Sequence, residues 1–210
     1  LLRIYEEARQ VPGIKHCFIG SGIRYDLCLS DTGNKEVDKT NRRYLETVIR
    51  HHVSGRFKVA PEHCSPTVLG LMRKPAFGLF QQLKSIFDEI NRKHRLNEQI
   101  IPYFISSHPG CRPEDMAKLA VATKTLDFKL EQVQDFTPTP MTVATTIYYS
   151  GYHPYSLQKI DTAKSEKEKK QQNMFFFWYK REFREQIMTL LRRIHRADLI
   201  PKLYGKEREK

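Results

Sequence analysis

Three peptides, in each of which an apolar run passes directly into a cluster of small and charged residues, constrain the fold most strongly. They are Ile19-Gly-Ser-Gly-Ile-Arg-Tyr-Asp26, Lys58-Val-Ala-Pro-Glu-His63 and Ile105-Ser-Ser-His-Pro-Gly-Cys111. Each peptide is expected to end a β-strand. In a parallel α/β protein the carboxyl ends of successive strands meet at one face. We therefore predict that the three clusters converge on one site.

Hydrophobic periodicity predicts that helices and strands alternate along the first 150 residues. The predicted strands cover residues 15–21, 56–60, 100–106 and 129–135. Predicted helices cover residues 1–11 and 77–94, and further helices end near His52 or begin at Pro66 and Pro113. The connections are long enough for parallel pairing. The order predicts an α/β fold with about four parallel strands, wound as part of a (β/α) barrel or as a doubly wound sheet.

Beyond Tyr149 the sequence changes character. Residues 148–155 are aromatic and rich in turn formers, residues 164–170 are a charge run, and Met174–His195 carries apolar residues at helical spacing. We predict one continuous helix from the charge run onward. Its apolar stripe is expected to dock on the barrel or on a part of the protein outside this chain. The predicted domains are residues 1–150, a barrel portion, and residues 151–210, a basic helical extension.

Composition restricts the class of protein. Apolar residues make up 40% of the 210 residues, which suffices for a hydrophobic core, and no run approaches the length of a membrane span. The four cysteines, Cys17, Cys28, Cys64 and Cys111, are too unevenly spaced for a disulfide framework. We predict reduced thiols and a cytoplasmic protein without a membrane. Because the chain starts inside a predicted helix without a methionine, we interpret it as a fragment.

The net charge of +12 raises the question of a nucleic-acid partner. From Asp161 onward there are 14 basic and 8 acidic residues, so half of the excess lies in the last 50 residues. Solvated helix faces explain most of this charge. An RNA-binding module that uses the basic tail, Trp178 and the tyrosines of residues 148–155 is the alternative function.

The segment around Lys58 and Glu62 places charge where a strand ends, and Pro61 prevents further pairing. Glu62 is a candidate acceptor for sugar hydroxyls, and Lys58 is a candidate partner for a carboxylate. A salt bridge between Lys58 and Glu62 is the structural alternative. In the first peptide, Arg24 and Asp26 either pair with each other or face a ligand.

The turn of residues 106–110 exposes backbone groups and hydroxyls that suit an adenine edge or a phosphate. An ordinary turn with Pro and Gly is the alternative, and a phosphate-binding barrel enzyme is a third reading of the function. On the last strand, Gln132, Gln134 and Phe136 are expected on one face, with Asp135 on the other.

Metal and nucleophile chemistry have weaker support. His63 with Cys64, or His108 with Cys111, offers zinc ligands, but no second pair at matching spacing exists. A cysteine–histidine hydrolase lacks a third group beside Cys64 and His63.

Five phrases within residues 18–142 together resemble the YgiQ-type radical S-adenosylmethionine (SAM) family. They are Phe18-Ile-Gly-Ser-Gly-Ile-Arg-Tyr-Asp-Leu27, His51-His-Val-Ser-Gly55, Lys58-Val-Ala-Pro-Glu-His63, Pro102-Tyr-Phe-Ile-Ser-Ser-His-Pro-Gly110 and Gln132-Val-Gln-Asp-Phe-Thr-Pro-Thr-Pro-Met-Thr142. The resemblance implies a partial (β/α)6 barrel, of which this chain supplies roughly strands three to six.

The resemblance also implies a cofactor and a reaction. In that family a Cys-x-x-x-Cys-x-x-Cys loop binds a 4Fe-4S cluster, and SAM is cleaved to a 5′-deoxyadenosyl radical that abstracts hydrogen from a substrate. A reductant such as flavodoxin or ferredoxin is implied as a partner. The loop that would hold the cluster is not in this sequence. We therefore expect the fragment alone to be inactive, and to self-associate through apolar edges.

By analogy with strand positions in that family, seven residues are expected near SAM. Ser21, Lys58 and Glu62 would face its ribose or carboxylate. Ser107 and His108 would lie near adenine, and Gln134 and Thr137 would approach adenine or the substrate. The resemblance does not imply a particular substrate.

Overall fold

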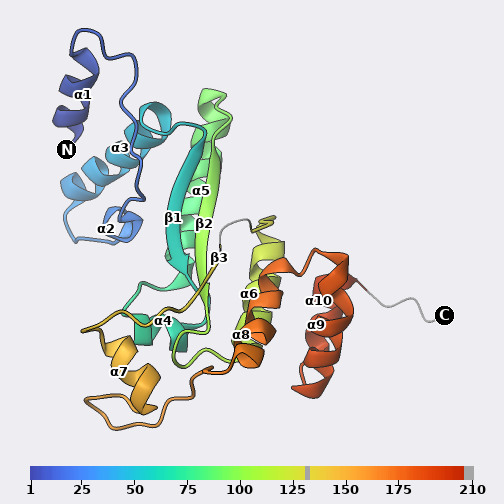
Figure 1. Cartoon of the computed structure of the whole chain (residues 1–210). Coiled ribbons are helices and arrows are strands. Elements are labelled where there is room, and N and C mark those ends of the chain that lie inside the picture. The colour runs from blue at the N-terminus through green and yellow to red at the C-terminus, as the bar shows by residue number, and fades with distance from the viewer. Residues whose placement is uncertain (131–132, 206–210) are drawn as a thin grey trace. The chain divides into compact units, whose positions relative to one another are not determined.

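The computed structural model describes residues 1–130 and 133–205, and its elements form an α/β fold (Figure 1). A three-stranded sheet has the order β1 (Arg56–Glu62), β2 (Gln99–Ser106), β3 (Val133–Asp135). Strands β2 and β3 are parallel, with Ile105 opposite Gln134. The helices are α1 (Leu2–Gln10), α2 (Tyr25–Leu29), α3 (Lys35–His51), α4 (Pro66–Met72), α5 (Phe77–His94), α6 (Pro113–Thr125), α7 (Val143–Ser150), α8 (Glu166–Asn173), α9 (Arg181–Arg193) and α10 (Ile200–Tyr204), with 3-10 turns η1 (Met174–Phe177) and η2 (Ala197–Leu199).

The chain forms two compact units. The first contains Leu1–Ala60 and Pro75–Pro102, and the second contains Pro61–Lys74 and Tyr103–Lys210. The boundaries fall within β1 and β2. The predicted division at residue 150 stays a prediction about domains.

The first unit has its core between α3, α5 and β1. Phe57 and Val59 are buried on β1, whereas Lys58 between them is exposed, as strand alternation requires. The Phe57 ring stacks on Phe87 of α5 with centroids 5.7 Å apart. Leu45 of α3 is also buried. The predicted strand at residues 56–60 and the predicted helix at residues 77–94 are therefore confirmed.

The predicted strand at residues 15–21 is wrong, because these residues form no ladder in the structure. The His52 carbonyl accepts a hydrogen bond from the Ile19 amide at 2.8 Å, and His52 Nδ1 lies 2.6 Å from the Cys17 carbonyl. These two bonds hold the segment against the end of α3 and not against a neighbouring strand. The described residues therefore form three strands rather than about four, and the barrel stays a prediction.

The second unit has its core around α6 and the carboxyl-terminal helices. Met116 of α6, Phe175 and Phe176 of η1, and Ile187 and Leu191 of α9 are buried. The apolar stripe is therefore packed, as predicted, but the continuous helix is wrong. Four consecutive apolar residues, 174–177, cannot all lie on one face of an α-helix, and the 3-10 turn η1 reorients them between α8 and α9.

The last predicted strand is shorter than expected, since β3 covers Val133–Asp135 and residues 131–132 lie outside the described residues. Helices α2, α7 and α10 are additions that the periodicity did not predict. The Thr142 side chain caps α7 by accepting the Thr145 amide at 3.2 Å. Among the described residues no helix is long and apolar enough to cross a membrane.

Candidate functional site

A pocket of about 450 Å³ lies in the second unit, at the carboxyl ends of β2 and β3 and beside Glu62, the last residue of β1. Polar strand-end residues and the C-terminal end of α4 line it together with the chain that follows β3. The lining residues are Glu62, Leu71, Met72, Arg73, Lys74, Ile105, His108, Gln134, Phe136, Thr137, Thr139, Thr142, Val143 and Ala144. We call this hollow the strand-end pocket.

Glu62 supplies the carboxylate of the strand-end pocket. Its backbone has φ 64°, a left-handed conformation that turns the chain sharply after β1. Glu62 Oε1 lies 2.9 Å from Lys74 Nζ, and the Glu62 side chain is 14% exposed against 41% for Lys74. The alternative pair of Glu62 with Lys58 is not found among the described residues, because Glu62 takes Lys74 as its partner.

His108 forms part of the pocket wall beyond β2. The residue is 4% exposed, and its Nδ1 lies 2.9 Å from the Pro109 carbonyl oxygen. Because a carbonyl only accepts hydrogen bonds, Nδ1 carries the proton and Nε2 is left as an acceptor. The His108 and Phe136 rings are in a T-shaped arrangement with a centroid distance of 5.0 Å. Burial lowers the pKa of His108, so the imidazole is neutral at neutral pH.

Strand β3 presents alternate side chains to opposite sides. Gln134 and Phe136 line the pocket. Asp135 instead accepts hydrogen bonds from the Ser106 hydroxyl and from Asn173 Nδ2, the latter at 3.1 Å. The predicted alternation is thus confirmed for these three residues, whereas Gln132 lies outside the described residues. Thr137, one of the predicted site residues, also lines the pocket.

Ser107 lies behind the pocket rather than in its wall. It is fully buried with φ 60°, and its amide donates to Gln172 Oε1 at 2.8 Å. Its hydroxyl has no hydrogen-bond partner among the described residues. The amides of Gly110 and Cys111 donate to the carbonyls of Asp161 and His108, each at 2.8 Å. Because these amides are engaged within the protein, the turn does not offer them to a phosphate.

Ser21 and Lys58 belong to the first unit. Ser21 is exposed and lines a separate hollow of about 610 Å³ with Tyr5, Arg24 and Tyr44 among its neighbours. Arg24 pairs with Asp26 through two hydrogen bonds of 2.8 and 2.6 Å, which lower the pKa of the Asp26 carboxyl. The internal-pair interpretation of these two residues is therefore the correct one.

His63 and Cys111 form a buried pair near the turn after β1. His63 Nδ1 accepts the amides of Cys64 and Ser65, both at 2.9 Å, and Nε2 lies 3.5 Å from Cys111 Sγ. Burial lowers the pKa of His63 to about 4 and raises the pKa of both cysteine thiols, that of Cys64 to about 12. A neutral imidazole beside protonated thiols gives no nucleophile.

Zinc has no support in the part of the chain that the structure describes, since no group of three or more His, Cys, Asp or Glu residues there is arranged to hold a metal ion.

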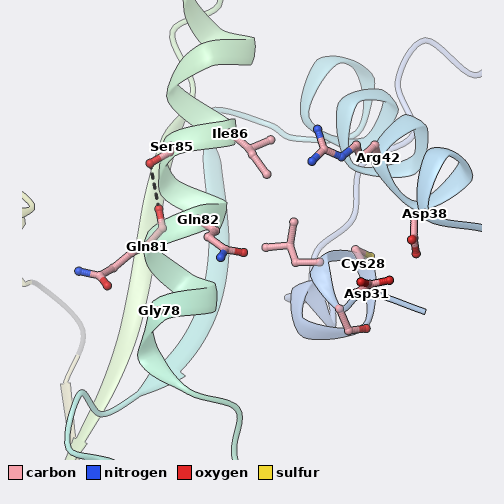
Figure 2. A pocket seen from close by; sticks show the side chains of 11 residues that line it. Cys28, Asp31, Asp38, Arg42, Gly78, Gln81, Gln82, Ser85 and Ile86 are labelled. Atoms are coloured by element: carbon pink, nitrogen blue, oxygen red, sulfur yellow. Dashed lines mark hydrogen bonds between the residues drawn. The ribbon is translucent and has the colours of Figure 1, made fainter. Parts of the chain in front are cut away.

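A larger hollow of about 820 Å³ lies in the first unit among α2, α3 and α5 (Figure 2). Gln82 and Ile86 point from α5 toward α2 and α3 in this view. The Asp38 carboxylate is engaged by the amide and hydroxyl of Thr32, at 3.2 and 2.8 Å. Burial raises the pKa of the Cys28 thiol. Neither Asp38 nor Cys28 is therefore an activated group, and the strand-end pocket, which Glu62, His108, Gln134 and Thr137 line, is the better candidate.

The aromatic residues invoked for RNA binding are partly committed to packing. Trp178 Nε1 donates to Thr123 Oγ1 at 3.2 Å, and Lys124 Nζ lies 5.7 Å from the centre of the indole ring. Lys164 and Lys169 lie over the Tyr148 ring. These contacts engage the Trp178 and Tyr148 rings, whereas Tyr149, Tyr152 and Tyr155 are exposed. Exposed tyrosines alone do not indicate a base-stacking surface, so the structure gives the RNA alternative no positive support.

Sequence reasoning missed the residues that hold the pocket from behind. Gln172, Asn173 and Asp161 contact the ends of β2 and β3. Gln172 is 65 residues from Ser107, its hydrogen-bond partner. Because residues 164–170 are mostly charged, the sequence indicated that α8 is exposed to solvent along its length. The one available signal was the three uncharged amide side chains of residues 171–173, directly after the charge run.

Fold and site together define an α/β protein with a polar pocket at the carboxyl ends of parallel strands. Residues 131–207 match the family model described as "Domain of unknown function (DUF3362)". The chain is similar over nearly its whole length to proteins named "UPF0313 protein". It is 59% identical over 206 residues to that of Bacteroides thetaiotaomicron, covering 98% of this chain and 33% of the relative.

The similarity extends across bacteria and archaea. The UPF0313 protein of Porphyromonas gingivalis is 56% identical over 206 residues, with 98% of this chain and 32% of the relative covered. That of Methanocella arvoryzae is 40% identical over 200 residues, with 95% of this chain and 32% of the relative covered. The chain thus spans about a third of the length of the curated relatives it matches.

Proposed function

We propose that this chain is part of a YgiQ-type radical SAM enzyme and that its strand-end pocket binds part of SAM. One observation carries the proposal: Glu62, His108, Gln134 and Thr137, all expected near SAM from their motifs, line a single pocket. The five motif phrases and the UPF0313 relatives add support. Since those relatives are about three times as long as the chain, they have room for a segment that binds the iron–sulfur cluster.

The residues of the pocket suit the chemistry of a nucleoside that carries a cationic group. The Glu62 carboxylate can accept hydrogen bonds from ribose hydroxyls or an amine. The Gln134 amide offers both a donor and an acceptor to a base edge, and Phe136 offers an aromatic surface. The volume of about 450 Å³ lies within the usual range of small-molecule sites.

His108 would act as a neutral partner for the ligand. Its proton is held at Nδ1 by the Pro109 carbonyl, so Nε2 is an acceptor of the kind that an exocyclic amine requires. Burial disfavours the imidazolium form. A neutral ring beside a cationic ligand also avoids charge repulsion.

The 4Fe-4S cluster of the complete enzyme would supply the electron that cleaves SAM. Its ligands would come from a segment outside this chain, because the sequence contains no Cys-x-x-x-Cys-x-x-Cys loop. We propose that flavodoxin or ferredoxin is the reductant, and that the fragment alone does not turn over.

The test uses the full-length parent, reconstituted anaerobically with iron and sulfide and supplied with SAM and dithionite. We expect 5′-deoxyadenosine from the parent and none from the 210-residue chain. Glu62→Gln in the parent is expected to weaken SAM binding about tenfold, because one charge-assisted hydrogen bond is lost. Glu182→Gln, at an exposed position of α9, is the matched control and should bind SAM normally. A reconstituted parent with neither cluster absorbance nor SAM cleavage would contradict the proposal.

A further inference from the structure

The strand-end pocket crosses the boundary of the segment matched by the DUF3362 model. Glu62, Arg73 and His108 precede the matched residues 131–207. Gln134, Phe136, Thr137, Thr139, Thr142, Val143 and Ala144 lie within them. The segment of unknown function therefore supplies one wall of the pocket and is not a module apart from it.

Gln172 of α8, in the same segment, bridges the two ends of the turn that carries His108. Its Oε1 accepts the Ser107 amide at 2.8 Å, and its Nε2 donates to the Cys111 carbonyl at 2.8 Å. The side chain is 3% exposed. Only a group with an acceptor and a donor side by side satisfies both backbone groups, so glutamine fits where glutamate does not.

The turn requires such support because its backbone is unusual. Ser107 has φ 60°, a conformation that is unfavourable for a residue with a side chain. Gly110 has φ 81°, and a Cβ at that position would lie 2.4 Å from Leu71 Cδ1, which itself lines the pocket. The Gly110 amide donates to the Asp161 carbonyl, and the Asp161 carboxylate pairs with Arg112 at 2.5 Å. The segment thus contacts the turn at three points.

Asn173, the next residue of α8, holds the end of β3. Its Nδ2 donates to Asp135 at 3.1 Å, and the same carboxylate accepts the Ser106 hydroxyl. With Asp135 held on this side, strand alternation directs Gln134 and Phe136 into the pocket. Two neighbouring side chains of α8 therefore hold both strand ends.

We propose that the DUF3362 segment completes and positions the strand-end pocket, with Gln172 and Asn173 as its positioning residues. For the identity of the ligand, the proposal rests on the proposed function. For the geometry it rests on the four hydrogen bonds that these two side chains and Ser106 make.

The test compares Gln172→Glu with Gln171→Glu in the full-length parent. At position 172 a carboxylate oxygen would face the Cys111 carbonyl in place of a donor, whereas the Gln171 side chain contacts the exposed Arg193. For Gln172→Glu we expect the dissociation constant of SAM to rise about tenfold, and amide exchange in residues 104–112 to accelerate about tenfold. Exchange in α9 should stay unchanged. Gln171→Glu should resemble the wild type in both measurements.

Asn173→Ala provides a second and independent variant. It should accelerate exchange in residues 133–137 and weaken SAM binding, and it should leave α9 protected. If Gln172→Glu unfolds the whole unit, local exchange and SAM binding in Asn173→Ala test the positioning role instead. If both variants unfold the unit, or if neither changes local exchange, the two residues do not position the pocket and the proposal is overturned.

Failure of the proposed function is a separate outcome. A wild-type parent that binds no SAM rejects the assignment of the ligand. The exchange measurement then still decides whether α8 holds the strand ends: faster local exchange in Gln172→Glu supports the positioning role, and unchanged exchange overturns it.

Discussion

The turns after β1 and β2 contain the same types of residue in the same order, but a different one of these residues lines the pocket in each turn. Each has a non-glycine residue of positive φ, Glu62 at 64° and Ser107 at 60°, followed by a buried histidine. Each then reaches a proline that opens a helix, α4 or α6. After β1 the left-handed residue lines the pocket and the histidine does not, whereas after β2 the histidine lines it.

The buried partners explain the difference. His63 is fully buried because its ring accepts two amides at the start of α4, a task that side chains usually perform from the cap position. After β2 the buried position belongs to Ser107, whose amide is taken by Gln172, and His108 is directed to the pocket. The side chain that lines the pocket is therefore determined by which group binds the backbone amides of each turn, and not by the local residue pattern.

The largest expected effect concerns the free energy of unfolding, which should fall much further in His63→Ala than in His108→Ala. His63→Ala leaves two amides without an acceptor and creates a cavity, so we expect the free energy of unfolding to fall by about 3 kcal/mol. His108→Ala loses one hydrogen bond beside an open pocket and should cost about 1 kcal/mol. Urea unfolding of the two variants measures both values.

A conservative variant serves as the control for this contrast. His63→Asn keeps an acceptor for the amides and should recover part of the loss. If the two alanine variants are equally destabilised, the contrast between the turns is wrong.

The second prediction concerns pH. The pKa of His63 is lowered by burial from 6.5 to about 4. Between these values the unfolded chain binds a proton at His63 and the folded chain does not, so acid favours unfolding. The contribution of neutral His63 to the free energy of unfolding is fully present above pH 6.5. As the pH falls toward 4, about 3 kcal/mol of stability is lost in total.

The comparison of variants isolates this contribution. Stability measured at several pH values should fall less steeply for His63→Asn than for the wild type. Equal slopes for the wild type and His63→Asn would show that His63 is not the buried neutral group.

Much of the fold was predictable because hydrophobic periodicity determines it. The helix at residues 77–94 and the strands at 56–60 and 100–106 follow from residues that are buried in the structure, such as Phe57, Phe87 and Phe104. The strand at residues 15–21 was not predictable in the same way. Its apolar run also suits an irregular segment, and the bonds of His52 decided between the two.

The site was predictable where chemistry and strand ends coincide. Glu62, His108, Gln134 and Thr137 follow apolar runs or alternate with them, and they line one pocket. Their supports were not predictable, because Lys74 and Gln172 act through tertiary contacts. Gln172 reaches the Cys111 carbonyl across 61 residues of sequence, and no local pattern encodes such a contact.

The smallest expected effects are changes in the free energy of unfolding that have opposite signs at the two turns. The Ser107 hydroxyl is buried without a partner among the described residues, so Ser107→Ala should raise the free energy of unfolding by about 1 kcal/mol. Glu62→Ala instead removes the partly exposed pair with Lys74 and should lower it by less than about 1 kcal/mol. Thermal unfolding of the two variants under identical conditions measures the signs.

Ser107→Gly separates backbone strain from the unpartnered hydroxyl. A glycine adopts φ 60° without steric cost, so relief of strain should add to the gain seen in Ser107→Ala, less the entropy that glycine loses on folding. Gln172 would still bind the amide of residue 107, because the substitution leaves that amide in place. A loss of stability in Ser107→Ala would mean that the hydroxyl has a bound partner, such as water. The turn after β2 would then be better satisfied than the turn after β1.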